Sequence, residues 1–154
     1  MPIVRLPPRD VEIHGLLFRE VLSVTEIEGG IATNVIPDHA RCTMNFRYAP
    51  NRTEEEAEIH LRELLGRPFE VRGNSPPARV VTDTPLLRRL RAAGGFTLEP
   101  KQAWTPVAEF SAHGLDAVNL GPGATRYAHT RDEQVAVSAL EQTYRALQKF
   151  ACAE

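Results

Sequence analysis

The chain has 154 residues, of which 42% are hydrophobic and 25% charged, and a formal net charge of −2. These values are ordinary for a soluble protein with one domain or two small lobes, and the scattered Lys and Arg give no reason to expect a nucleic acid or an acidic membrane as partner. The N-terminus lacks the apolar segment of a signal peptide, no run approaches the roughly 20 apolar residues of a membrane span, and the two cysteines form no CxxC pair. We therefore expect a cytoplasmic protein.

The first predicted elements are two strands and a helix. Residues 20–28 are rich in β-branched side chains, and residues 40–48 alternate between apolar and polar side chains with the period of two of a strand. The glycine-containing link between them is too long for a tight hairpin. Thr53 and Glu56 have the spacing of a capping box, which predicts a helix that begins there and ends at Gly66.

A short third strand is predicted at residues 69–71, and a boundary follows at residues 73–77, where two prolines disfavour helix and strand alike. The order strand, strand, helix, strand is that of half a ferredoxin-like sandwich. The fold class predicted for the whole chain is mixed α/β.

Beyond the boundary, helices and strands alternate, which favours α/β packing. The last helix is predicted to begin at Ser138, with Glu141 completing a second capping box, and to have an apolar face of Leu140, Tyr144, Leu147 and Ala151. The other predicted elements are a helix at residues 84–95, a strand at 101–104, a helix at 107–112 and a strand at 116–120.

The residues alone do not define an active site. There is no G-x-S-x-G nucleophile elbow and no glycine-rich phosphate loop ending in Lys-Ser or Lys-Thr. A catalytic zinc ion needs about three protein ligands. His129, in the run GPGATRYAHTRDEQV at residues 121–135, is the most plausible ligand, but that run holds no second one. The remaining histidines are explained by loops, a helix surface and a helix end: His14, His39, His60 and His113.

In order and spacing, several short motifs resemble the two-zinc amidohydrolases and exopeptidases, a family that includes aminoacylases, acetylornithine deacetylase and desuccinylases. The sequence of residues 11–37 is most similar to the desuccinylase branch. The matching motifs are Gly29-Gly30, Asn34-Val-Ile-Pro37, Asn45-Phe-Arg47, Trp104-Thr105, Phe110-Ser-Ala, Ala117-Val-Asn-Leu-Gly-Pro-Gly123, Ala128-His129 and Asp132-Glu133.

The resemblance implies two lobes. Residues 1–77 would be a lid or dimerisation lobe, incomplete at its N-terminus, and residues 78–154 the C-terminal portion of a metal-binding α/β domain. It implies a homodimer through the lid, or association with the absent N-terminal half of the family chain.

The resemblance also implies site residues. His129 matches the last metal ligand of a centre that holds two zinc ions, where cobalt or manganese is also possible. Arg47 and Asn34 match lid positions that contact a substrate carboxylate, often in the partner subunit's site. Arginine suits that role because its guanidinium binds carboxylates through two parallel hydrogen bonds. The matching pocket-lining residues are Thr105, Gly121 and Gly123.

The departures from the family pattern concern catalysis and specificity. The family's other metal ligands, its Glu-Glu pair with the general base and its lid histidine are absent, so no catalytic residue is assigned in this chain. Pro106 stands where the pattern usually has aspartate, and Glu109 where it usually has arginine.

Three interpretations follow. The chain is the C-terminal part of a desuccinylase-like enzyme that cleaves an N-succinyl amide, such as that of N-succinyl-diaminopimelate in lysine and cell-wall precursor biosynthesis, and is inactive alone. Alternatively, it is a dimerisation or binding module that lost the chemistry, or part of an N-acetyl amino acid deacetylase.

Overall fold

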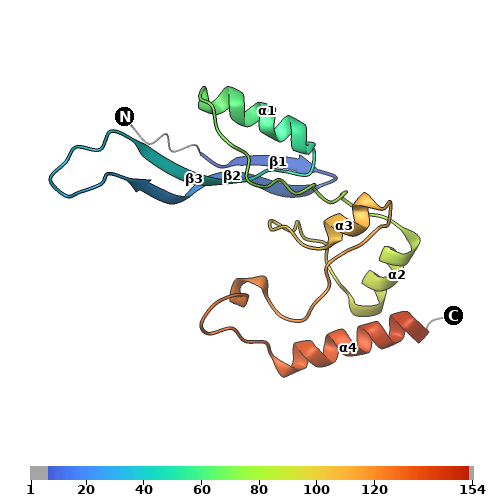
Figure 1. The fold of residues 1–154 in the computed structure, drawn as a ribbon. Coiled ribbons are helices and arrows are strands. Elements are labelled where there is room, and N and C mark those ends of the chain that lie inside the picture. The colour runs from blue at the N-terminus through green and yellow to red at the C-terminus, as the bar shows by residue number, and fades with distance from the viewer. Residues whose placement is uncertain (1–6, 153–154) are drawn as a thin grey trace.

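The computed structural model describes residues 7–152 and has the mixed α/β fold predicted from the sequence (Figure 1). The N-terminal part holds an antiparallel sheet in the order β1-β2-β3, followed by helix α1. The C-terminal part holds helices α2, α3 and α4 and a short 3₁₀ turn, η1. Figure 1 shows β2 and β3 extending as a long arm away from the C-terminal part.

β1 (Arg9–Ile13) and the start of β2 (Leu16–Gly29) form a hairpin that the sequence analysis did not predict. Its two-residue loop has positive φ at both positions, 51° at His14 and 78° at Gly15. Such a loop matches the right-handed twist of the flanking strands. The strand predicted at residues 20–28 is therefore the second half of a longer strand.

The strand predicted at residues 40–48 is confirmed as β3 (Ala40–Arg47), which pairs with β2 from Val21 opposite Arg47 to Gly29 opposite Ala40. A register shift between Val24 and Glu26 marks a β-bulge. The connection between these strands is a loop and not a tight hairpin, as expected.

Helix α1 (Glu54–Leu65) begins and ends as predicted. Thr53 accepts a hydrogen bond from the Glu56 N–H while the Glu56 carboxylate accepts one from the Thr53 N–H, and Gly66 ends the helix with a φ of 58°. The His60 ring lies 5.9 Å from the Phe46 ring, between centroids, so α1 packs over Phe46 near the end of β3.

Two sets of contacts define the junction between the two parts. On the N-terminal side, the Tyr48 hydroxyl donates toward Asn74 Oδ1 at 3.0 Å and the Ser75 carbonyl at 2.8 Å. On the C-terminal side, the Arg79 N–H donates to Ser111 Oγ at 2.8 Å, and the Arg79 guanidinium pairs with Asp116. Residues 76–78 thus form the connection between the two anchored ends.

In the C-terminal part, α2 is confirmed, with Thr84 as its cap and Gly95 at φ 67° as its end, and it packs against α4. The second predicted capping box is wrong, because α4 begins at Val137 and Ser138 is already inside the helix. The Glu141 carboxylate accepts a hydrogen bond from Arg145 instead. The elements are α2 (Pro85–Gly94), α3 (Val107–Ala112), η1 (Thr125–Tyr127) and α4 (Val137–Cys152).

The strands predicted at residues 69–71, 101–104 and 116–120 are not formed. A strand exists only where a neighbouring backbone accepts and donates its ladder hydrogen bonds, and no segment within residues 7–152 pairs with these three. Their apolar side chains stay uncovered: Trp104 is 55% exposed and Val118 41%.

The surface of the chain is correspondingly large. Its accessible area is 12212 Å², whereas a compact monomer of this mass has about 7,700 Å². The predicted apolar face of the last helix is part of this surface, with Leu140 and Leu147 each 45% exposed and Tyr144 67%. None of the helices in residues 7–152 combines the length and the apolar character needed to cross a bilayer.

Candidate metal and substrate site

His129 lies in the loop between η1 and α4 and is exposed. Its backbone has a φ of 60°, in the left-handed region that histidine enters more readily than most residues. Its N–H donates to Glu133 Oε2 at 3.2 Å, so the Glu133 carboxylate fixes the loop and leaves the imidazole accessible. This arrangement suits a ligand, and the ligand role stays a prediction.

The described residues do not complete a metal site around His129. Within residues 7–152, no group of three or more His, Cys, Asp or Glu side chains is placed to hold an ion. One exposed imidazole supplies one metal ligand, and a zinc site needs about three ligands from the protein. The chain thus offers a single candidate ligand.

The two glycines predicted to line the pocket differ in what the backbone requires. Gly123 has a φ of 85°, and a Cβ there would come within 3.0 Å of the Val135 side chain, so a larger residue would strain the turn. A Cβ at Gly121 would meet no atom within 4 Å. Nothing in the described structure explains why position 121 is glycine.

Thr105 lies just before α3 and is held by a residue that the sequence analysis did not single out. Asn119 Nδ2 donates to Thr105 Oγ1 at 3.0 Å. Since Asn119 is two residues before Gly121, this bond places Thr105 beside the start of the Gly121–Gly123 turn. Asn119 was missed because only the fold shows its distance to Thr105.

The two predicted carboxylate-binding residues do not meet within one chain. Arg47 is the last residue of β3, and Asn34 lies in the loop before β3 begins, so the length of the strand separates them. That length is about 24 Å for a strand that rises about 3.4 Å per residue. Both side chains are exposed. Arg47, at the end of the strand near the C-terminal part, is therefore the lid residue closer to Thr105.

Comparison with known proteins places this geometry in a family context. Residues 5–72 match the model of the peptidase dimerisation domain. This match falls within the predicted lid lobe, residues 1–77. The boundary of that lobe stays a prediction.

Most of the chain is similar to curated desuccinylases. It is 36% identical over 145 residues to a putative succinyl-diaminopimelate desuccinylase of Mycobacterium tuberculosis, covering 92% of this chain and 41% of that protein. It is 37% identical over 152 residues to the succinyl-diaminopimelate desuccinylase of Corynebacterium glutamicum, covering 92% of this chain and 40% of that protein. A probable carboxypeptidase of Aspergillus fumigatus is 28% identical over 146 residues, with 86% of this chain and 31% of that protein covered. The chain thus spans about two fifths of the length of the desuccinylases it matches.

Proposed function

Because this chain belongs to the M20 peptidase family, whose dimerisation domain residues 5–72 match, we propose that it supplies the lid and part of the metal-binding domain of an amidohydrolase. The substrate class is an N-acyl amino acid, with N-succinyl-diaminopimelate as the first candidate. The observation that carries this proposal is similarity over 92% of the chain to proteins named succinyl-diaminopimelate desuccinylase.

The exposed surface supports the idea that further protein, outside these 154 residues, covers this part of the molecule. The accessible area of 12212 Å² exceeds that of a compact monomer by about 4,500 Å². A standard protein interface covers only about 800 Å² per partner. The excess therefore suits a much larger contact, in which the unpaired segments at residues 101–104 and 116–120 receive neighbouring strands.

In this proposal each predicted site residue except Asn34 has one task within this chain. Arg47 binds a substrate carboxylate through its guanidinium, Thr105 and the Gly121–Gly123 turn line the pocket, and His129 contributes one metal ligand. His129 would hold one zinc ion together with ligands from outside this chain, and such an ion would supply Lewis-acid chemistry for a water molecule and the amide carbonyl. We place the protein in the cytoplasm as a dimer formed through the lid.

The test is complementation. The chain is co-expressed with the part of the Corynebacterium glutamicum desuccinylase that it does not cover, and the purified complex is assayed with zinc for release of succinate from N-succinyl-diaminopimelate. We expect hydrolysis by the complex and none by the chain alone.

Variants assign the roles within the complex. His129→Ala should abolish activity, whereas His39→Ala, which changes another exposed histidine, should leave it unchanged. A complex that releases acetate from N-acetyl substrates and no succinate would indicate the deacetylase alternative. A stable zinc-loaded complex that hydrolyses neither would show that the chain is a dimerisation or binding module.

A further inference from the structure

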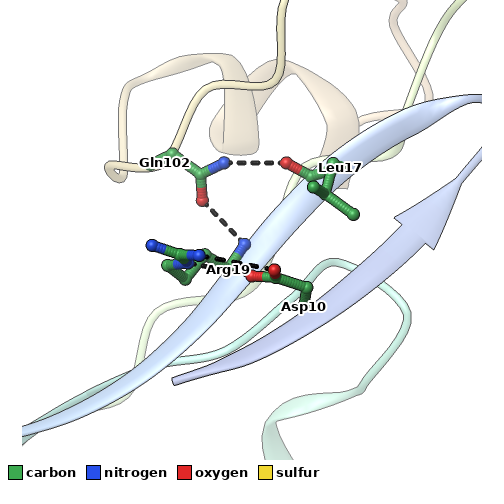
Figure 2. A network of polar contacts seen from close by, with 4 residues as sticks. All are labelled: Asp10, Leu17, Arg19 and Gln102. Atoms are coloured by element: carbon green, nitrogen blue, oxygen red, sulfur yellow. Dashed lines mark hydrogen bonds and ion pairs between the residues drawn. The ribbon is translucent and has the colours of Figure 1, made fainter. Parts of the chain in front are cut away.

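Gln102 connects the two parts of the chain through its side-chain amide. It lies in the irregular segment between α2 and α3, far along the sequence from the sheet. Its Nε2 donates to the Leu17 carbonyl at 3.0 Å, and its Oε1 accepts a hydrogen bond from the Arg19 N–H at 2.9 Å (Figure 2). A neighbouring strand would bind this same pair of groups, an N–H and a carbonyl two residues apart on one edge of a strand.

The edge that Gln102 occupies is open because β2 is longer than its partners. β1 pairs with the first residues of β2, and β3 pairs only from Val21 onward, where Val21 is opposite Arg47. Successive residues of a strand present their peptide groups to opposite edges, so Leu17, Arg19 and Val21 share the edge on which β3 lies. Beyond Arg47 the chain turns away from that edge.

The residues after β3 explain why it does not continue. The Ala49 N–H donates to Glu20 Oε1 at 3.3 Å, and Pro50 has no N–H to donate. The ladder positions at Leu17 and Arg19 would otherwise lack a protein partner on this side. The amide of Gln102 supplies the donor and the acceptor of one further strand residue.

We propose that Gln102 is a positioning residue that fixes the orientation of the C-terminal part against the sheet and holds the Trp104–Thr105 segment beside Arg47. Arg19 lies only about 7 Å along β2 from Val21, the residue opposite Arg47. From Gln102 the chain continues directly to Thr105, which Asn119 holds. The substrate role of Arg47 rests on the proposed function, but the contact of Gln102 with β2 does not.

A second attachment between the two parts matters because residues 76–78 connect them through a single stretch of chain. One such connection permits rotation of one part against the other. No helix or strand of the described N-terminal part approaches one of the C-terminal part closely, since such contacts occur between β1 and β2, β2 and β3, and α2 and α4. The contact of Gln102 with β2 is therefore placed where it restricts that rotation.

The two native cysteines allow a direct test of orientation. Cys42 on β3 and Cys152 on α4 are both exposed, one in each part. With nitroxide labels on both, the full chain should give one narrow distance distribution by pulsed electron paramagnetic resonance. Gln102→Leu should broaden it, and Gln148→Leu, a matched change of an exposed glutamine on α4, should not. Singly labelled Cys42→Ser and Cys152→Ser chains identify distances between copies.

Amide hydrogen exchange distinguishes a local hydrogen bond from a general stabilising effect, because a general effect would change the exchange rates of Arg19 and Phe18 alike. In Gln102→Leu, exchange at the Arg19 amide should accelerate roughly 3- to 10-fold, the effect of one lost hydrogen bond. The Phe18 amide, in the residue paired with Val11 of β1, should keep its rate.

Gln102→Glu covers the case in which Gln102→Leu does not fold. A carboxylate still accepts from Arg19 but cannot donate to Leu17, whereas a protonated carboxyl does both. The label distribution of this variant should therefore be broad at neutral pH and should narrow as the pH falls through the pKa of the new carboxyl, ordinarily about 4.3. Unchanged distances and unchanged Arg19 exchange in these variants would overturn the proposal, and so would an equal acceleration at Phe18 and Arg19.

Discussion

Glu20 and Arg52 form a nearly buried ion pair beneath α1. Arg52 Nε donates to Glu20 Oε1 at 2.8 Å, and the side chains of Glu20 and Arg52 are only 4% and 18% exposed, respectively. The Ala49 N–H also donates to the Glu20 carboxylate, and Arg9 lies 3.8 Å from it. The pair joins β2 to the segment between β3 and α1, so it sets how the helix follows the sheet.

Arg52→Leu should destabilise the chain by about 3 kcal/mol, because it leaves a buried carboxylate with its principal partner removed. The matched control is Arg145→Leu, which removes an exposed partner 3.4 Å from Glu141 and should cost less than about 0.5 kcal/mol. Urea unfolding of both variants measures the difference. Equal midpoints for the two would contradict the structural role of Glu20.

Tyr48 should make the chain less stable at alkaline pH. Burial raises the pKa of its phenol above the usual 10, and the Glu54 and Glu58 carboxylates raise it further. The unfolded chain then loses this proton first, so stability is complete below about pH 10 and falls as the pH rises toward the folded pKa. Tyr48→Phe should remove this loss and, at neutral pH, cost about 1 kcal/mol for the hydroxyl's hydrogen bond.

The measurement for Tyr48 is the absorbance of tyrosinate against pH, taken as the difference between the parent chain and Tyr48→Phe. Tyr144→Phe is the control because that ring is 67% exposed. A difference curve for Tyr48 with its midpoint at or below 10 would show that the phenol is not held at the junction with Asn74 and Ser75.

The features predicted correctly from the sequence are those that local contacts determine. The capping box of α1 and the proline and glycine at the ends of α2 involve residues a few positions apart, and both helices formed as expected. The capping box at Ser138 had the same spacing but was wrong, because α4 already begins at Val137 and a cap must precede its helix.

The features that local sequence could not predict depend on partners far along the chain. Residues 101–104 and 116–120 have strand-like sequences, yet they form no strand within residues 7–152 because no neighbouring strand pairs with them. Gln102 gave no signal, and Asn119 was assigned no role although it stands inside a family motif, because their roles are set by contacts with β2 and Thr105. The His14-Gly15 turn was detectable, since glycine at the second loop position is typical of tight hairpins.

The β1–β2 turn predicts a purely conformational effect. Gly15 has a φ of 78°, and a Cβ there would meet nothing within 4 Å. Gly15→Ala should therefore cost about 1–2 kcal/mol from backbone strain alone, while His14→Asn, which keeps a residue tolerant of positive φ, should be neutral or stabilising. Thermal unfolding distinguishes them. If Gly15→Ala were as stable as the parent chain, the turn would have another conformation.

Asp10 and Arg19 make an exposed pair across β1 and β2, with Nε 2.8 Å from the carboxylate. The hydrogen bond from Arg19 lowers the pKa of the Asp10 carboxyl, against a smaller opposing effect of desolvation. A lowered pKa contributes stability above the unfolded value of about 3.9 that is lost as the pH falls through the folded value. Arg19→Met should return the Asp10 midpoint to its ordinary range in an NMR titration, and an unchanged midpoint would exclude the pair in solution.

Helix α4 has two apolar faces that should respond differently to charge. One faces α2 and contains Ala146, which is 2% exposed. The other contains Leu140 and Leu147, each 45% exposed, and we infer that the protein part that completes the site covers it.

Leu140→Glu combined with Leu147→Glu should change the free energy of unfolding of the isolated chain by less than about 0.5 kcal/mol per site. The same variant should fail to copurify with that polypeptide, because association would bury two unpaired charges.

Ala146→Glu should instead destabilise the isolated chain by at least about 2 kcal/mol, since its carboxylate has no room between α2 and α4. Denaturant unfolding and copurification of both variants separate the two faces. A complex that tolerates both leucine substitutions would show that this face of α4 is not covered by the partner.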